Sequence, residues 1–367
     1  MGNKKVLVIT NSVYQLFTAV HMKRALLKSC DVDLIVTDVT PQLKETIPRL
    51  VETGLFTRVI FGEVQALNRK FAAVKEEELS EGFRNRDRLL RWVLNEKPAE
   101  YEEIYFANFD PFLRILASLY YDSPCECIWY EDGFSSYVID YLREDRALIN
   151  RHPEGIKIRE KVKSVLLYEP RLAMRGDCLP NLALPKVRRE DKELKNLLNH
   201  IFAYEPLENR GDFADFIFLE QSFRAEGLKT NDMELMEECR KVVDSGRFIV
   251  KPHPRNPENL PFLLGLTRRY PSSVPWELFL MNEEVENKAV ITVCSNAALA
   301  GRLIFGMDMD TVMLYRLFRG KVLWKEDGIL KRYLEKFHRQ FAGEKYYVPQ
   351  TVYELRSTLR YLMGQKL

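Results

Sequence analysis

Residues 126–133 read Glu-Cys-Ile-Trp-Tyr-Glu-Asp-Gly, a mostly apolar run that ends in a turn with two acidic residues. The helix-like stretch Phe112 to Tyr120 precedes this run, so the local order is helix, strand and turn. Upstream, short β-branched or apolar runs alternate in the same way with longer amphipathic ones. This βαβα alternation predicts a parallel sheet flanked by helices.

The alternation covers most of the chain. In the first half, strands are expected at Val6 to Ile9, Val32 to Val36, Arg58 to Phe61, Glu103 to Ala107 and Glu126 to Tyr130. Residues 140–210 are rich in charged residues and interrupted by Pro. We interpret them as additional elements at the end of the first domain, followed by a linker. Strands resume at Phe216 to Leu219, Phe248 to Val250, Ala289 to Val293 and Val312 to Tyr315.

Two domains are expected, because 367 residues exceed the usual size of one hydrophobic core. The first covers residues 1–190 and includes the linker, and the second covers residues 205–345. Residues 346–367 form a terminal helix that is free to pack back on the N-terminal domain. The fold class is α/β, with two Rossmann-like parallel-sheet domains.

Composition excludes several classes of protein. Lys and Arg number 55 against 53 Asp and Glu, and a formal charge of +2 argues against a nucleic-acid binder. The six cysteines are scattered, which is typical of a reduced, cytoplasmic protein. No uncharged run approaches the ~18 residues of a membrane span, so at most a peripheral membrane contact is expected.

Two adjacent carboxylates, Glu131 and Asp132, end a predicted strand, and Gly133 can take the left-handed conformation that such a turn often needs. The ordinary alternative is a surface turn, in which Asp-Gly is common. Chemistry in α/β sheets is done at the carboxyl ends of strands. The aromatic pair Trp129 and Tyr130 favours a functional role, because it could desolvate a carboxylate and raise its pKa toward that of a useful base.

The segment Val250-Lys251-Pro252-His253-Pro254 also follows an apolar strand. A lone histidine is more often structural than catalytic, but here Pro252 and Pro254 stiffen the backbone. Lys251 and His253 point to the same side if the strand continues, which gives a rigid cationic corner suited to a phosphate. His253 is therefore the candidate proton donor.

Ser295 and Asn296 follow the strand Ala289 to Val293 and precede a helix start. Either residue could simply cap the helix, yet an exposed helix N-terminus also presents N–H groups to an anion. Glu277 begins another apolar segment, where its ordinary role is to complement a helix end. A buried carboxylate at that place could instead accept two ribose hydroxyls.

Other chemistries have no support. The sequence has no Gly-rich dinucleotide fingerprint and no phosphate loop that ends in Gly-Lys-Ser/Thr, so hydride transfer and ATP hydrolysis are not indicated. Two Asp-x-Asp patterns, at residues 31–33 and 308–310, precede strands rather than follow them. We reject both as divalent-metal sites and expect no metal and no other cofactor.

Together, Glu131-Asp132-Gly133, His253-Pro254, Glu277 and Ser295 resemble the motif set of bacterial sialyltransferases. The likeness is greatest to the lipooligosaccharide sialyltransferases, glycosyltransferase family fifty-two, and the spacing from His253 to Ser295 is similar to that of their donor domains. The resemblance implies a GT-B fold, in which an acceptor-side domain and a nucleotide-sugar domain face a central cleft.

The resemblance also implies roles for particular residues. Asp132 takes the proton of an acceptor hydroxyl, which attacks a CMP-activated sialic acid or related nonulosonic acid and inverts its configuration. His253 acts as acid toward the departing phosphate. The nucleotide-binding set is Lys251, Pro254, Glu277, Ser295 and Asn296, and the acceptor-side or turn set is Glu131, Gly133, Asn11 and Gln15. Because CMP leaves with a single phosphate, no divalent ion is expected.

The implied acceptor is a glycan or glycolipid, such as a bacterial surface polysaccharide or lipooligosaccharide. Basic segments such as Lys186 to Arg189 indicate either a solvated helix face or peripheral contact with the inner face of the plasma membrane. Two other enzyme classes stay open: a CDP-glycerol glycerophosphotransferase and a UDP-hexose glycosyltransferase. A non-catalytic nucleotide-binding protein is disfavoured, since it needs no paired base and acid.

Overall fold

The computed structural model describes residues 2–72, 74–143, 148–205, 214–253, 255–256, 268–270, 274–320 and 327–365. They fall into two compact units. Unit 1 comprises Met1–Pro185 and Lys192–Ala203, and unit 2 comprises Lys186–Asp191 and Tyr204–Leu367. Each unit is built on one parallel sheet with helices, which confirms the expected α/β class.

The sheet of unit 1 has seven strands in the order β3-β2-β1-β4-β5-β6-β7. Its strands are β1 (Lys5–Thr10), β2 (Asp31–Thr37), β3 (Arg58–Gly62), β4 (Glu103–Phe106), β5 (Glu126–Tyr130), β6 (Val162–Leu167) and β7 (Asn181–Ala183). All of these neighbours pair in parallel. The order reverses between β1 and β4, and ligands of doubly wound sheets bind beside such a switch.

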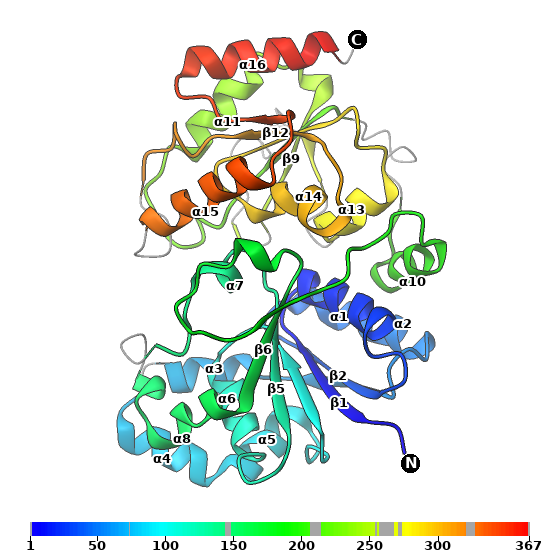
Figure 1. Cartoon of the computed structure of the whole chain (residues 1–367), viewed down its shortest axis with the longest axis vertical. Helices are drawn as coiled ribbons and strands as arrows, with labels where there is room; N and C mark the ends of the chain where they lie inside the picture. Colours follow the sequence, from blue (N-terminus) through cyan, green and yellow to red (C-terminus); the bar gives the residue numbers. More distant parts are fainter. Residues whose placement is uncertain are drawn as a thin grey trace. The chain divides into compact units, whose positions relative to one another are not determined.

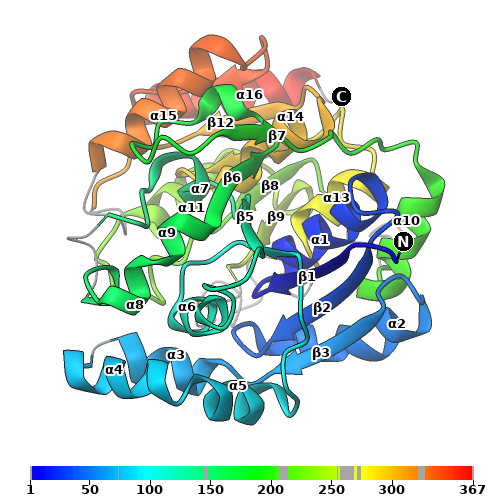
Figure 2. The ribbon, with the colours of Figure 1, turned by 60° about the horizontal axis from the view of Figure 1, so that its bottom comes forward.

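Helices cover both faces of this sheet. They are α1 (Val13–Ala25), α2 (Ile47–Glu52), α3 (Gln65–Ala72), α4 (Glu76–Arg84), α5 (Arg86–Leu94), α6 (Pro111–Ser118), α7 (Ser135–Val138), α8 (Pro153–Ile156), α9 (Ile158–Lys161) and α10 (Lys192–Phe202), with short 3-10 helices η1 (Pro41–Thr46), η2 (Leu148–Asn150) and η3 (Pro170–Leu172). Helices α1 and α10 lie on one face, and α5 and α6 lie on the other (Figure 1 and Figure 2).

Local sequence explains where the elements of unit 1 begin and end. Residues 6–8 of β1 are 0% exposed, and such apolar runs are typical of parallel strands covered on both faces. Ser12 caps α1 and Asp110 caps α6, and each side chain accepts a backbone N–H of its helix. Both caps follow strands, so they bring polar groups to the carboxyl edge of the sheet.

The structure differs from the sequence-based interpretation over residues 140–210. This segment contains β6 and β7, which extend the first sheet, and α10, which packs on α1 and α2. Neither strand shows the apolar pattern that is typical of a buried strand. β6 carries a Lys and a Ser, and all three residues of β7 are exposed. The chain leaves unit 1 after Pro185, returns at Lys192 and leaves again after Ala203, so no single boundary near residue 190 exists.

The sheet of unit 2 has six strands in the order β10-β9-β8-β11-β12-β13. Its elements are β8 (Phe216–Leu219), α11 (Asp232–Arg240), η5 (Ser245–Arg247), β9 (Phe248–Lys251), β10 (Arg268–Arg269), α13 (Trp276–Asn282), β11 (Ala289–Thr292), η6 (Asn296–Leu299), α14 (Ala300–Phe305), β12 (Asp310–Met313), α15 (Asp327–Gln340), β13 (Tyr346–Tyr347) and α16 (Val352–Gln365). Here the order reverses between β8 and β11. No helix in the described part of the chain is long and apolar enough to cross a membrane.

The basic segment Lys186 to Arg189 is an extended piece of unit 2 rather than a solvated helix face. Val187 donates its N–H to the Ile304 carbonyl at 2.9 Å, and Arg189 pairs with Glu286 at 2.9 Å. Part of its charge is therefore neutralised within the unit. This weakens the segment as a candidate for membrane contact.

The terminal helix α16 lies in unit 2, where it packs on α11 (Figure 1). Its buried side chains are Leu355, Leu359 and Leu362, which form one face of the helix. The sequence leaves this helix free to pack back on the N-terminal domain. In the structure its apolar face is instead buried within unit 2.

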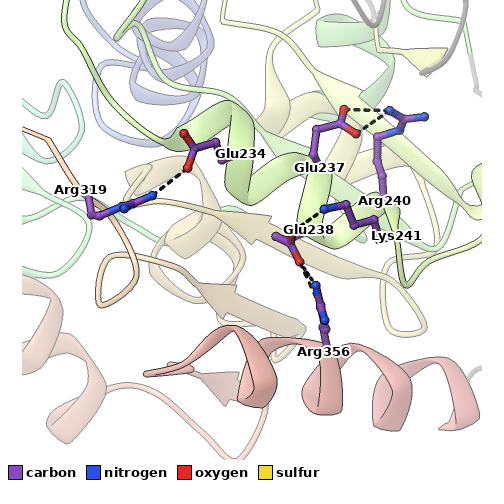
Figure 3. Close-up of polar contacts among 7 residues, drawn as sticks. All are labelled: Glu234, Glu237, Glu238, Arg240, Lys241, Arg319 and Arg356. Carbon is purple, nitrogen blue, oxygen red and sulfur yellow. Dashed lines mark hydrogen bonds and ion pairs between the residues drawn. The ribbon is translucent and has the colours of Figure 1, made fainter.

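Ion pairs accompany the contact between α11 and α16 (Figure 3). Glu238 of α11 accepts bonds from Lys241, the residue directly after this helix, at 2.6 Å and from Arg356 Nε of α16 at 3.1 Å. These two cations lower the pKa of Glu238. Its neighbour Glu237 pairs with Arg240, also on α11, at 2.8 Å.

We expect Glu238→Gln to loosen α16, because it removes the charge that holds Arg356. Partly exposed pairs contribute about 0–1 kcal/mol, so amide hydrogen exchange in α16 should rise several-fold with little change in global stability. Glu237→Gln is the matched control and should leave α16 unchanged. Equal exchange in both variants would contradict the assignment.

The lowered pKa of Glu238 means that this stabilisation is present above the ordinary value of 4.5 and is lost as pH falls through the folded-state pKa.

Candidate functional site

The candidate groups of unit 1 gather at the carboxyl edge of its sheet, beside the switch between β1 and β4. Asn11 follows β1, Asn108 and Asp110 follow β4, and Asp132 follows β5. Because neighbouring parallel strands end at the same edge, segments that are distant in sequence meet there. Hydrogen bonds link all four side chains into one cluster.

Asp132 is half-buried in this cluster. Asn108 Nδ2 donates to Asp132 Oδ2 at 2.9 Å, and the Asp132 N–H donates to Ser136 Oγ at 2.7 Å. Burial raises the pKa of Asp132 above its ordinary value, while hydrogen bonds from Gln15 and Asn108 limit the rise. A carboxylate whose basicity is raised in this way is suited to accept a proton.

The aromatic residues before Asp132 belong to the core. Trp129 and Tyr130 are 1% and 0% exposed. The Trp129 ring N–H donates to the Ala107 carbonyl at 3.2 Å, and the Tyr130 hydroxyl donates to the Ile9 carbonyl at 2.6 Å. They exclude water from this strand end as buried side chains, so they are not an exposed wall of the site.

Glu131 has a different environment from its neighbour. It is 1% exposed, and its carboxylate accepts the Tyr14 hydroxyl at 3.0 Å, the Tyr168 N–H at 2.8 Å and the Tyr137 hydroxyl. These donors make Glu131 a structural anchor that joins three segments of unit 1. Gly133 has a φ of +69°, the left-handed conformation expected for the turn.

Asn11 and Gln15 belong to the hydrogen-bonded cluster that contains Asp132. The Asn11 N–H donates to Gln15 Oε1 at 2.7 Å, and Gln15 Nε2 donates to Asn108 Oδ1 at 2.7 Å. Asn11 and Gln15 are only 7% and 2% exposed, which leaves little of either for an acceptor. Asn108 itself was missed from sequence, although it is a polar residue directly after the predicted strand Glu103 to Ala107.

Asp110 is a second carboxylate of the cluster that sequence reasoning missed. It accepts bonds from Asn68 Nδ2 at 3.1 Å and Asn11 Nδ2 at 3.2 Å, and it caps α6. Burial raises the pKa of Asp110, and these hydrogen bonds oppose the change. The signal available in sequence is an Asp before Pro111, which is a common helix start.

His253 follows β9 at the corresponding edge of the unit 2 sheet. Its Nδ1 accepts the Arg255 N–H at 3.3 Å, so the neutral ring carries its proton on Nε2. Burial, followed by the charges of Arg255 and Lys251, lowers the pKa of His253 to about 4. The ring is thus neutral at pH 7, and a bound anion would raise its pKa. Pro254 lies outside the described residues.

Lys251 and Glu277 are neighbours in unit 2 although they are distant in the sequence. Lys251 Nζ donates to the Val274 carbonyl at 3.0 Å and lies 4.8 Å from the centre of the Tyr270 ring. Burial lowers the pKa of Lys251 to about 8, and the Glu277 carboxylate opposes this change. Glu277 is 4% exposed in the first turn of α13.

Ser295 and Asn296 follow β11, beside the switch of the second sheet. Ser295 Oγ accepts the Ala297 N–H at 3.3 Å and so caps η6. Asn296 Oδ1 accepts the Tyr333 hydroxyl at 2.9 Å, which ties this side chain to α15. The ordinary capping role of Ser295 is therefore observed, and its contact with a phosphate stays a prediction.

Glu220 directly follows β8 and supports the loop that carries His253. It is 6% exposed, and its Oε2 accepts the Asn256 amide at 3.1 Å and the His253 N–H at 3.4 Å. Arg224 pairs with the same oxygen at 3.1 Å. Sequence reasoning missed Glu220, although the polar pair Glu220-Gln221 directly follows an apolar strand.

Both Asp-x-Asp patterns contribute to ordinary ion pairs. Asp33 pairs with Arg58 at 2.6 Å, and Asp308 pairs with Arg302 at 3.0 Å. Over the residues that the structure describes, no three His, Cys, Asp or Glu side chains form a group that could hold a metal ion. Independence from metals itself stays a prediction.

Residues 6–314 match the family model described as alpha-2,8-polysialyltransferase (POLYST). The chain belongs to this polysialyltransferase family. The matched range contains both strand-end motifs as well as Glu277 and Ser295. No curated protein matches the sequence. The sialyltransferase part of the resemblance is thus supported, whereas the lipooligosaccharide type is not addressed by the match.

Solved structures share the architecture at low sequence identity. The chain resembles Glycyrrhiza uralensis UGT73P12 complexed with glycyrrhetinic acid 3-O-monoglucuronide, with a TM-score of 0.55 and 13% identity over 99% of this chain and 88% of that one. It also resembles the glycotransferase of kitacinnamycin, with a TM-score of 0.51 and 9% identity over 99% and 94% of the two chains. The fold of this polysialyltransferase family member is therefore the GT-B fold of glycosyltransferases.

Proposed function

We propose that the protein transfers sialic acid, or a related nonulosonic acid, from a CMP donor to a hydroxyl of an acceptor glycan. The observation that carries the proposal is Asp132, a carboxylate of raised pKa at the carboxyl edge of a sheet in a sialyltransferase-family chain. Transfer to a hydroxyl needs a base of this kind, because the alcohol must lose its proton as it attacks.

The proposed step is a direct displacement with inversion. The acceptor oxygen forms a bond to the anomeric carbon while Asp132 takes its proton. The bond from that carbon to the CMP phosphate oxygen breaks, and its electron pair leaves on the phosphate. His253 neutralises this charge, first by a hydrogen bond from Nε2 and then as an acid once the phosphate has raised its pKa.

The donor is proposed to bind in unit 2. Lys251 and Ser295 hold the phosphate oxygens, Glu277 accepts ribose hydroxyls, and Pro254 and Asn296 complete the nucleotide set. The buried ammonium of Lys251 has a lowered pKa of about 8, so a phosphate would hold it in the charged form. A single phosphate makes a divalent ion unnecessary in this scheme.

The acceptor is proposed to be a bacterial surface glycan, and the family description favours one that ends in sialic acid. A lipooligosaccharide is the other acceptor of this kind. The place of action would be the cytoplasm, with peripheral contact to the inner face of the plasma membrane when the acceptor is lipid-borne.

Thermal-shift measurements with CMP, CDP and UDP test the donor class. We expect CMP to stabilise the protein by about 2.7 kcal/mol at a hundred times its Kd, and UDP to have little effect. Lys251→Met should reduce the CMP shift, whereas Lys241→Met, a matched change at the exposed residue that follows α11, should not. A shift with UDP alone would favour a UDP-hexose enzyme, and a shift with CDP alone would favour an enzyme of the CDP-glycerol type. Either result overturns the proposal.

A further inference from the structure

We infer that Asn108 is a positioning residue for Asp132, and that a chain of side-chain amides anchored on one backbone N–H fixes its orientation. The inference rests on the proposed function, because Asn108 acts only through the base. Asn108 does not belong to the sequence motifs that suggested the activity.

The chain of amides starts at a group that can only donate, the backbone N–H of Asn11. This N–H faces Gln15 Oε1 at 2.7 Å, so Gln15 Nε2 must be the end that faces Asn108 Oδ1, also at 2.7 Å. A primary amide has one accepting end and one donating end. Asn108 therefore presents Nδ2 to Asp132, where it lies 2.9 Å from Oδ2.

A second branch leads to the same orientation. The Thr37 hydroxyl lies 2.8 Å from Asn11 Oδ1, and Asn11 Nδ2 donates to Asn108 Oδ1 at 3.0 Å and to Asp110 Oδ2 at 3.2 Å. The other oxygen of Asp110 accepts the Leu113 N–H at 2.8 Å. Asn108 Oδ1 thus accepts two amide donors while its Nδ2 faces Asp132, so Asn108 cannot turn over without breaking three hydrogen bonds.

This polarity selects one charge state of Asp132. A donor held against Oδ2 is satisfied by an ionised carboxylate, whereas a proton on that oxygen would compete with the Asn108 hydrogen. Burial favours the neutral acid, and Asn108 opposes it. Burial makes this base more basic than an exposed Asp, and the Asn108 donor favours its ionised form.

The test is the pH dependence of kcat/KM in Asn108→Leu and Asn108→Asp. Leu keeps the branched shape and removes the donor, so the acidic limb should move up by about one pH unit while the plateau at higher pH is largely retained. Asp keeps the shape and places a second carboxylate against Asp132, so the limb should move further in the same direction. A purely structural role would lower the plateau and leave the midpoint in place.

Asn68→Leu is the matched control. Asn68 lies in the same network and donates to Asp110 at 3.1 Å, with no hydrogen bond to Asp132 in the described residues. Its removal should lower stability without moving the acidic limb. If the acidic limb of the kcat/KM profile stays in place in both Asn108 variants while Asp132→Asn is inactive, the inference about Asn108 is wrong and the proposed function is unaffected. Normal transfer by Asp132→Asn would instead overturn the proposed function, so the two failures are distinguishable.

Discussion

Asp132→Asn is expected to lower kcat by at least about a hundredfold, because general base catalysis commonly contributes factors of about 10²–10⁴. The isosteric amide can still accept the Asn108 hydrogen bond that Asp132 Oδ2 accepts at 2.9 Å, so the turn should keep its shape. Donor affinity should change little, since the proposed nucleotide residues lie in unit 2. The measurement is initial-rate transfer from labelled CMP-sialic acid, together with CMP binding by calorimetry.

Stability provides an internal check on this variant. Burial raises the pKa of Asp132, so the folded state binds a proton more tightly than the unfolded state, and the ionised group costs stability as pH rises through its folded-state pKa. The neutral amide should therefore leave Tm unchanged or raised at pH 7. Asp140→Asn, the same change at another half-buried position of unit 1, should retain activity. Near-normal transfer by Asp132→Asn would exclude this residue as the base.

His253→Gln is expected to have the second largest effect, a loss of roughly a hundredfold in kcat that is greatest for poor leaving groups. The free ring has a pKa lowered to about 4, so it is neutral at pH 7, and in the proposed mechanism the donor phosphate raises that pKa. Wild-type protein should therefore take up protons when it binds CMP near pH 6, and His253→Gln should not. Calorimetry in buffers of different ionisation enthalpy measures this uptake directly.

The lowered pKa of His253 also sets the sign of its contribution to stability. The unfolded state, with the ordinary pKa of 6.5, binds more protons than the folded state between that value and about 4. Stability therefore falls as pH drops through this range, and His253→Gln should flatten the curve. His338→Gln, an exposed histidine of the same unit, is the control and should change neither activity nor proton uptake. Proton uptake that survives in His253→Gln would assign the titrating group elsewhere.

The sequence predicted the strands that carry these two residues because their side chains are apolar on both faces. β5 and β9 were expected within one residue of their ends, and so were the polar residues that follow them. It failed for β6, whose apolar run is interrupted by a Lys and a Ser, and for the edge strand β7, whose three residues are all exposed. It also failed for Glu131, since nothing in a Glu-Asp-Gly turn says which carboxylate will be buried.

The alternation of short apolar runs with amphipathic ones thus determined the α/β class and the strand ends, and the motifs Glu131-Asp132-Gly133 and Lys251-Pro252-His253 gave the candidate base and acid. All of these depend on short-range pattern. Tertiary structure alone decided that Asn11, Asn108 and Asp110 form one hydrogen-bonded cluster with Asp132, because their meeting depends on strand order and on the switch between β1 and β4. It also decided that α16 packs on α11. Strand order and helix docking arise from contacts between distant segments, and no local pattern of residues encodes them.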